Sequence, residues 1–207
     1  MPTAAAHTTP HPWPYVTPGI TDSLFERLPG IPMTQRETRL AILSQLRLEP
    51  TSVLWDIGAG TGTIPVETGL ICPHGRIIAV ERDPDVVALI QANCDRFRVK
   101  NVEIHEGSAP DCLDRLPAPP NRICIEGGKD LVATIDRAWD LLDGAGRIVI
   151  IANTLDALYI SSERLATHHA RHIEVVQSTG NRLEKRGSHQ IFAPVAPTFI
   201  LSGEKSP

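Results

Sequence analysis

The amino-acid sequence predicts an α/β fold, in which a mostly parallel sheet of seven to eight strands carries helices on both faces. Short apolar runs alternate with amphipathic segments from about residue 53 to residue 165, which is the pattern of repeated strand–helix units. The last two predicted strands follow one another across a polar connection. Such a pair favours an antiparallel hairpin at the C-terminal end of the sheet.

The first helix is predicted from a capping box, Thr34-Gln35-Arg36-Glu37, in which Thr34 is the N-cap. We expect Leu40, Leu43 and Leu46 on its buried side, and an end before Pro50. Thr34 is therefore a cap first and only second a possible cofactor contact.

The later elements follow in chain order. Asp83 is the expected N-cap of one helix and Pro84 its first residue, where the missing N–H costs nothing. We expect strands at 53–57, 76–81, 102–105, 122–126, 147–152, 172–180 and 190–203. We expect helices from about 63, at 84–97, from about 110, from 131 to 141 and from 155 to 165.

Length and composition favour one globular domain of residues 21–205, preceded by an extended arm of residues 1–20 that is rich in Pro, Thr, Ala and His. Trp13 and Tyr15 in the arm suggest docking on the body or on a neighbouring subunit. A net charge of −4 does not favour nucleic-acid binding, and no apolar run is long enough to span a membrane.

Cysteine spacing and the first residues indicate a cytoplasmic protein. Nothing before Arg27 resembles a secretory signal, because basic residues and an apolar core are missing. No Cys-x-x-Cys pair occurs, so we expect reduced thiols and no metal site. The four cysteines are Cys72, Cys94, Cys112 and Cys124.

A glycine turn follows the first strand, in the pattern Asp-x-Gly-x-Gly-x-Gly from Asp56 to Gly62. Glycine lets the backbone approach a ligand where a Cβ would clash. Glu81 ends the next strand about twenty residues later, and a carboxylate there can accept hydrogen bonds from both ribose hydroxyls. The two features together indicate a cofactor that contains a nucleoside.

The spacing of the glycines favours S-adenosylmethionine over a dinucleotide. A dinucleotide site typically has the pattern Gly-x-Gly-x-x-Gly. Here the third glycine is Gly62 and the next position is Thr63. Asp56 is placed to hold an ammonium group or a bound water. A turn without a ligand would explain the glycines but leave Glu81 a coincidence. The cofactor-binding candidates are Asp56, Gly58, Ala59, Gly60, Thr61, Gly62 and Glu81, with Ser108 and Ala109 framing the adenine.

The loop after the fourth strand, Glu126-Gly127-Gly128-Lys129, carries information about the substrate. It lacks the Asn/Asp-Pro-Pro-aromatic motif of enzymes that methylate amino groups. Its glycines leave a floor for a bulky, flat molecule. Glu126 is a candidate catalytic residue, as a general base or an orienting acid. An alternative is that Glu126 only accepts hydrogen bonds from a neighbouring helix start.

Basic residues gather at two places on this acidic chain. Arg36 and Arg39 lie on the first helix, and a second group lies between the last two strands. Such a cluster can bind a polycarboxylate through charge-assisted hydrogen bonds. A solvated hairpin tip is the alternative. The second group contains Arg182, Lys185, Arg186 and His189.

Several of these motifs occur in one order that resembles a known family. The motifs are Pro32-Met33-Thr34 leading into Glu37-x-Arg39, the glycine turn, and Gly107-Ser108-Ala109-Pro110. From about residue 14 to residue 205 the chain resembles the CbiT-type decarboxylating precorrin (cobalt-precorrin) methyltransferases of cobalamin biosynthesis. Two departures are the fourth loop, where many members have Gly-Gly-Ser-Gly-Gly, and Glu81 in place of Asp.

The resemblance implies a class I S-adenosylmethionine-dependent methyltransferase with a Rossmann-like fold. It implies methylation of carbon 15 of a precorrin and decarboxylation of the acetate arm on carbon 12. Thr34, the Gly58–Gly62 turn, Glu81 and Ala109 would contact the cofactor. The substrate carries several carboxylates that the basic residues would bind. The substrate-binding candidates are Arg36, Gly127, Gly128, Lys129, Arg182 and Arg186. The family also implies a homotetramer and a separate partner enzyme that methylates carbon 5.

Three alternatives stay open at this point. A tRNA adenosine methyltransferase has a similar catalytic domain but needs a basic face for phosphates. A non-catalytic S-adenosylmethionine-binding subunit would support a partner enzyme. A nicotinamide-dependent oxidoreductase fails on the spacing of the glycines.

Overall fold

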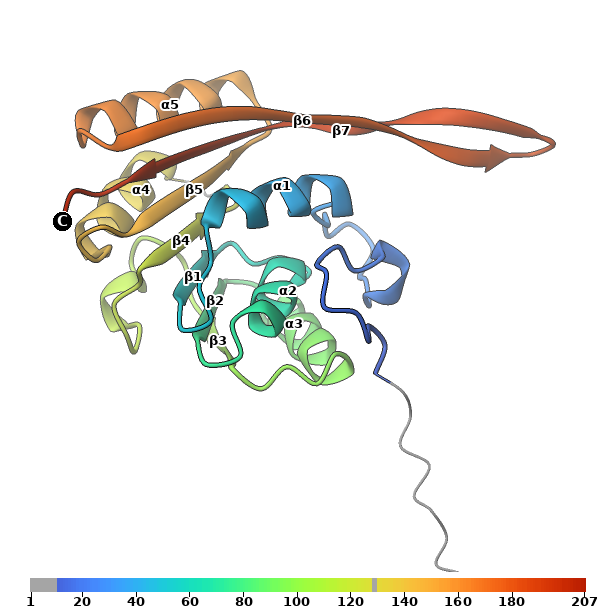
Figure 1. Cartoon of the computed structure of the whole chain (residues 1–207), viewed down its shortest axis with the longest axis horizontal. Helices are drawn as coiled ribbons and strands as arrows, with labels where there is room; N and C mark the ends of the chain where they lie inside the picture. Colours follow the sequence, from blue (N-terminus) through green and yellow to red (C-terminus); the bar gives the residue numbers. More distant parts are fainter. Residues whose placement is uncertain (1–10, 128–129) are drawn as a thin grey trace, which may run out of the picture.

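A computed structural model of the chain describes residues 11–127 and 130–207. Its sheet has seven strands in the order β3-β2-β1-β4-β5-β7-β6, shown in Figure 1. The first five strands pair in parallel, and β7 pairs antiparallel with both β5 and β6. This confirms the predicted mostly parallel sheet with a C-terminal hairpin.

The elements occur in the chain order that the apolar runs predict. They are η1 Asp22–Leu24, α1 Arg36–Leu46, β1 Val53–Ile57, α2 Thr63–Ile71, β2 Arg76–Glu81, α3 Pro84–Arg96, β3 Val102–Glu106, η2 Leu113–Arg115, β4 Arg122–Ile125, α4 Leu131–Leu141, β5 Arg147–Ala152, α5 Leu155–Thr167, β6 Arg171–Arg186 and β7 His189–Glu204.

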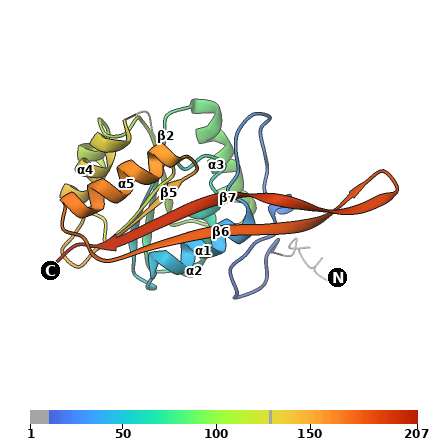
Figure 2. The same ribbon diagram turned by 90° about the horizontal axis from the view of Figure 1, so that it is seen from above.

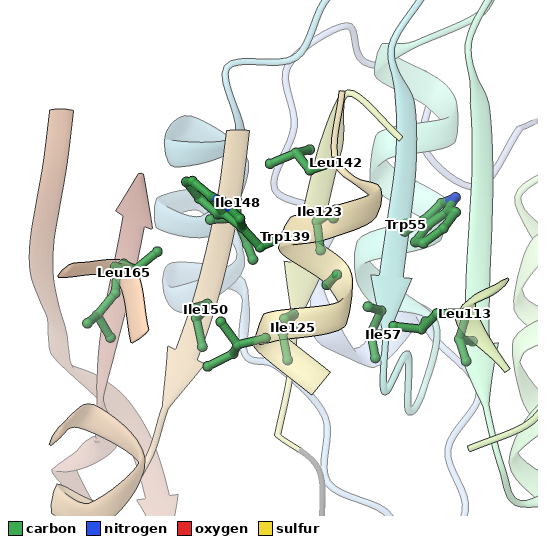
Figure 3. Close-up of a cluster of buried hydrophobic side chains, with 14 of the residues drawn as sticks. Trp55, Ile57, Leu113, Ile123, Ile125, Trp139, Leu142, Ile148, Ile150 and Leu165 are labelled. Carbon is green, nitrogen blue, oxygen red and sulfur yellow. The ribbon is translucent and has the colours of Figure 1, made fainter. Parts of the chain in front are cut away.

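Helices cover both faces of the sheet, as Figures 1 and 2 show. One face packs against α1, α2 and α3, and the other against α4, α5 and η2. Figure 3 shows the second face, where Trp139 of α4 and Leu165 of α5 lie against strand residues such as Ile148 and Ile150. The central strands are buried on both sides, which is why they are almost continuously apolar.

Most predicted boundaries agree with the structure. Asp83 caps α3, where its side chain accepts from the backbone N–H of Asp85, and Pro84 is the first residue of the helix. The helix expected from about residue 110 is only one 3-10 turn, Leu113–Arg115. All four cysteines are free and buried. In the described part of the chain, no helix is both long and apolar enough to cross a bilayer.

One of the three leucines expected on the buried side of α1 is exposed. Leu40 is 37% exposed, whereas Leu43 and Leu46 are buried. Arg39 and Ile42 are also buried on this helix. The periodicity of leucines alone was a poor guide, because the buried face of α1 also carries polar side chains that have partners.

The C-terminal hairpin is much longer than predicted. The strands expected at 172–180 and 190–203 are Arg171–Arg186 and His189–Glu204, so the predicted polar connection is itself paired strand. Its distal half projects beyond the rest of the sheet (Figures 1 and 2). Both faces there meet solvent, so the apolar alternation that marks a half-buried strand is missing. Phe192 on this projection is 74% exposed.

The segment before α1 packs on the body of the protein. His11 hydrogen-bonds the Phe97 carbonyl oxygen at 2.8 Å, and Trp13 packs against the cluster around α3. Ile20 and Phe25 are fully part of that cluster. The domain boundary at residue 20 stays a prediction. These contacts hold the segment from residue 11 onward against the body of the protein ahead of the start of α1.

Candidate active site

Two adjoining cavities lie beyond the carboxyl ends of β1, β2 and β4, where ligands bind in open parallel sheets. The larger, about 450 Å³, is lined by Glu81 and by the loops after β1 and β3. The smaller, about 310 Å³, lies toward α1, β5 and the hairpin. Four residues line both cavities, namely Pro32, Gly58, Gly60 and Glu126. The junction between the cavities is therefore the place where two bound molecules would meet.

The glycine turn is held against β2 by its own backbone. The N–H groups of Gly58 and Ala59 both donate to the Val80 carbonyl oxygen, at 2.9 and 3.1 Å. Gly58 has φ +83°, and a Cβ there would lie 3.0 Å from the carbonyl oxygen of Glu126. Glycine is required at this point because the conformation is left-handed and β4 approaches closely.

Glu81 is oriented by three backbone donors. One carboxylate oxygen accepts from the Gly60 N–H at 3.1 Å, and the other accepts from the N–H groups of Arg82 and Asp83 at 2.8 and 3.2 Å. The oxygen that accepts from Gly60 keeps a second lone pair, so the carboxylate can accept from a ribose hydroxyl without losing a backbone donor. Its position in the larger cavity fits a ribose, and the residues present fit the predicted nucleoside cofactor.

The other predicted cofactor contacts divide between the cavities. Ser108 and Ala109 line the larger one, where Gly107 leaves room for the loop to turn. Ala59 and Thr61 line the smaller one. Gly62 lines neither and instead lets α2 approach α3, because a Cβ there would lie 3.0 Å from Ile90.

Thr34 is not a helix cap, contrary to the prediction. Gln35 occupies the N-cap position of α1 and makes no side-chain capping bond. The Thr34 hydroxyl donates instead to a carboxyl oxygen of Glu126 at 2.7 Å. The expected local partner was a backbone N–H donor, whereas the observed partner is a distant carboxyl acceptor. This bond places Thr34 and Glu126 together in the smaller cavity.

Glu126 is surrounded by groups that set its ionisation. Burial raises its pKa to about 7, while the Thr34 hydrogen bond and the charge of Arg39 act in the opposite direction. Near neutral pH a substantial fraction of this carboxyl is therefore protonated. A group that gains and loses protons in this range is suited to general acid–base chemistry.

Asp56 lies behind Glu126 and is completely closed off from solvent, at 0% exposure. It pairs in register with Cys124 of the neighbouring strand. A carboxyl oxygen of Asp56, the Cys124 sulfur and a carboxyl oxygen of Glu126 lie within 4.8 Å of one another. Burial first, then repulsion from Glu126, raises the pKa of Asp56 well above its usual value. Asp56 lines neither cavity, so it is not placed to contact the cofactor directly.

Arg39, considered in the sequence as a substrate ligand, is fully buried and already paired. Its Nε donates to Glu67 at 2.5 Å and its Nη1 to Asp22 at 3.1 Å and to the Thr34 carbonyl oxygen at 2.7 Å. A buried cation needs such partners. Arg39 therefore fastens the segment before α1 to α2, and the expectation of a substrate contact was wrong for it.

The remaining basic candidates lie outside the two cavities. Arg182 of β6 forms ion pairs with Glu37 and with Asp22, the latter at 2.6 Å. Arg36 pairs with Glu37 at 3.4 Å. Arg186 lies at the exposed hairpin tip and pairs with Glu184 at 3.6 Å. Of the fourth loop, Gly127 lines the larger cavity, and Gly128 and Lys129 lie outside the described residues.

Sequence reasoning missed two buried polar residues that hold the segment before α1 against the helices α2 and α3. Asn93 of α3, which is buried, donates to the carbonyl oxygens of Thr61 and Glu26 and accepts from the Glu26 N–H. Glu67 accepts from the N–H groups of Gly19 and Ile20. An Asn and a Glu inside helices that are otherwise apolar on that face were the available signal, because such groups are buried only with partners.

Comparison with known proteins agrees with this architecture. A family model for the precorrin methyltransferase domain matches residues 27–205. The probable cobalt-precorrin-6B C(15)-methyltransferase (decarboxylating) of Pyrobaculum calidifontis is 37% identical, covering 92% of this chain and 97% of the relative. The cobalt-precorrin-6B C(15)-methyltransferase (decarboxylating) of Salmonella typhimurium is 32% identical, covering 89% and 95%.

A solved structure gives the same result. The crystal structure of precorrin-6Y C5,15-methyltransferase from Geobacter metallireducens superimposes with a TM-score of 0.85 at 35% identity, covering 92% of this chain and 98% of that one. These similarities favour a precorrin methyltransferase over the tRNA adenosine methyltransferase considered from the sequence.

Proposed function

Because the chain belongs to the precorrin methyltransferase family, we propose that it methylates carbon 15 of a precorrin and decarboxylates the acetate arm on carbon 12, in cobalamin biosynthesis. The observation that carries the proposal is the pair of cavities joined at Gly58, Gly60 and Glu126. One cavity suits a nucleoside and the other suits part of a second molecule, so a methyl group can pass between them.

S-Adenosylmethionine is the proposed cofactor, and it supplies an electrophilic methyl group when bound. The chain's contribution is alignment, because positioning two reactants supplies much of the rate of such a transfer. Glu81 holds the ribose, Ser108 and Ala109 flank the adenine, and the Gly58–Gly62 turn lies along the backbone of the cofactor. Thr34 and Thr61 line the smaller cavity, where the methionine end of the cofactor would meet the second molecule.

The substrate is a flat macrocycle with several carboxylate arms. Glu126 is the proposed catalytic residue at the junction, and Gly127, Gly128 and Lys129 are proposed substrate contacts. Arg36, Arg182 and Arg186 are the proposed contacts for its carboxylates. Arg182 is held by Glu37 and Asp22, so a substrate carboxylate would have to share or displace these partners.

Mass analysis of a single turnover tests the reaction. The purified chain is mixed with S-adenosylmethionine and with cobalt-precorrin-6B or its cobalt-free counterpart. We expect a product that has gained one methyl group and lost one CO₂. A Glu81→Ala control should lose cofactor binding in calorimetry. Cofactor binding without any product from either macrocycle would favour a non-catalytic subunit and contradict the proposal.

Titrations with Arg182→Ala and Arg186→Ala test the substrate contacts. We expect both substitutions to weaken binding of the macrocycle by more than they weaken binding of S-adenosylmethionine. Equal losses for the two ligands would contradict the assignment.

We also propose that the protein is a cytoplasmic homotetramer that works beside a separate carbon-5 methyltransferase. The support for assembly is the long edge strand β6, which offers unpaired backbone groups, and the exposed Leu183 and Phe192. Light scattering of the wild type and of Phe192→Asp tests this. A wild type that is monomeric at all concentrations would contradict it.

A further inference from the structure

Decarboxylation of an acetate arm needs a proton donor, and the structure offers one group at the junction of the two cavities. When CO₂ leaves, the C–C bond between the methylene and carboxylate carbons breaks, and its electron pair enters the conjugated ring. The methylene carbon must then gain a proton to become a methyl group. The step requires no oxidant or reductant. It requires an acid that is protonated at the moment when the carbon can accept.

We propose that Glu126 is this acid, and that Thr34 is the positioning residue that fixes which of its oxygens carries the proton. The assignment rests on the proposed function and deepens it. Glu126 lines both cavities, so it can reach a carbon of the substrate beside the bound cofactor. In the part of the chain that the structure describes, no other carboxyl group lines both cavities.

The hydrogen bond from Thr34 determines the direction of the donated proton. The Thr34 hydroxyl donates to Oε2 of Glu126 at 2.7 Å, so Oε2 acts as an acceptor. In the neutral carboxyl, the proton then lies on Oε1. Transfer from Oε1 leaves a carboxylate whose Oε2 is already stabilised by Thr34, and solvent entering the open cavity restores the proton.

Burial keeps Glu126 protonated near neutral pH. Asp56 of β1 and Cys124 of β4 lie close to it, and Glu81 of β2 acts on Asp56. Burial also raises the pKa of the Cys124 thiol, so the thiol is uncharged, and none of these three groups is a cation. Arg39 is the cation that acts on Glu126 from α1, and it is shared with Glu67 and Asp22.

Infrared difference spectra test the protonation without substrate or cofactor. Wild-type minus Glu126→Gln spectra should show the C=O band of a protonated carboxyl at pH 6 that disappears with a midpoint at about pH 7. In Thr34→Val, which loses the donor but keeps the volume, the midpoint should move to higher pH. Absence of the band at pH 6, or an unchanged midpoint in Thr34→Val, would overturn the assignment.

Turnover tests the role of the proton. Removing a general acid typically costs about 10²–10⁴-fold, so Glu126→Gln should lower kcat at least about 100-fold and change the Kd for S-adenosylmethionine less than about threefold. Wild-type kcat should fall as the pH rises through about 7. Glu163→Gln on the exposed face of α5 is the matched control and should behave as the wild type.

The outcomes separate the two proposals. A wild type that forms product together with an equally active Glu126→Gln would overturn the proton assignment alone. A kcat that rises with pH would make Glu126 a base and would also overturn it. A wild type that never forms product would remove the proposed function and this assignment with it.

Discussion

Two buried acidic regions lie within one small domain, and they are built in opposite ways. Around Glu67, the carboxylate meets the Arg39 guanidinium and two backbone N–H groups. Around Asp56, the neighbours are another carboxyl and a thiol. The first region is a buried ion pair that fixes the chain before α1. In the second, burial without a neighbouring cation raises the pKa of Asp56, and Glu126 lines both cavities. The contrast teaches that a buried acid supports structure or chemistry according to whether a cation accompanies it.

The largest expected effect comes from breaking the first region. Glu67→Gln leaves Arg39 with only part of its compensating charge inside the protein, and we expect a loss of roughly 3–5 kcal/mol in the free energy of unfolding. Urea denaturation measures it. Glu103→Gln, which breaks a surface pair with Arg76, is the control and should cost about 1 kcal/mol or less. Similar losses for both variants would contradict the contrast.

The next effect depends on pH and comes from the second region. The pKa of Glu126 rises from 4.5 to about 7 on folding, so its contribution to stability is lost as the pH rises through that window. Gln does not ionise, so Glu126→Gln does not lose stability as the pH rises through this window. We expect it to be more stable than the wild type by about 3 kcal/mol at pH 8 and by less than about 1 kcal/mol at pH 5. Thermal melts at the two pH values measure this, and a gap that is independent of pH would refute it.

A smaller effect is expected at the link between the hairpin and α1. The Arg182 side chain hydrogen-bonds Glu37 and lowers its pKa, so this contribution is present above the usual pKa of Glu37 and is lost as the pH falls. Arg182→Ala should cost about 1 kcal/mol at pH 7 because the pair is partly exposed. Arg186→Ala at the hairpin tip is the comparison and should cost less. Equal costs in chemical denaturation would show that Arg182 does not anchor α1.

The smallest expected effect is at Asp56, and it tests most directly whether the two buried acidic regions differ in charge. Burial raises the pKa of Asp56 and favours its neutral form, to which the Asn of Asp56→Asn is nearly equal in volume. We expect less than about 1 kcal/mol of change at pH 7. Urea denaturation beside Glu67→Gln gives the measurement. A loss as large as that of Glu67→Gln would mean that Asp56 is ionised in the folded protein.

The fold and the positions of the glycine turn and Glu81 could be predicted because their causes are local. The glycines from Gly58 to Gly62 are demanded by backbone conformation and by close approach, and Glu81 follows from its place at a strand end. Both kinds of constraint appear within a few residues. The buried parallel strands were equally clear, because burial on both faces leaves little room for polar residues.

The substrate side could not be predicted, because its contacts cross the sequence. Thr34 has a local role available as a cap, yet its hydroxyl reaches Glu126, ninety-two positions away. Arg39 has the charge expected of a residue that binds a substrate carboxylate. Only the tertiary structure reveals that it is already paired with Glu67 and Asp22. The hairpin was underestimated because pairing between two solvated strands leaves no apolar periodicity to detect.

The close approach of Gly58 to the carbonyl oxygen of Glu126 has an implication for protein engineering. A side chain introduced at position 58 would press against the backbone of Glu126 and displace the acid. Attempts to broaden cofactor choice at this turn would then disturb the proposed proton delivery as well.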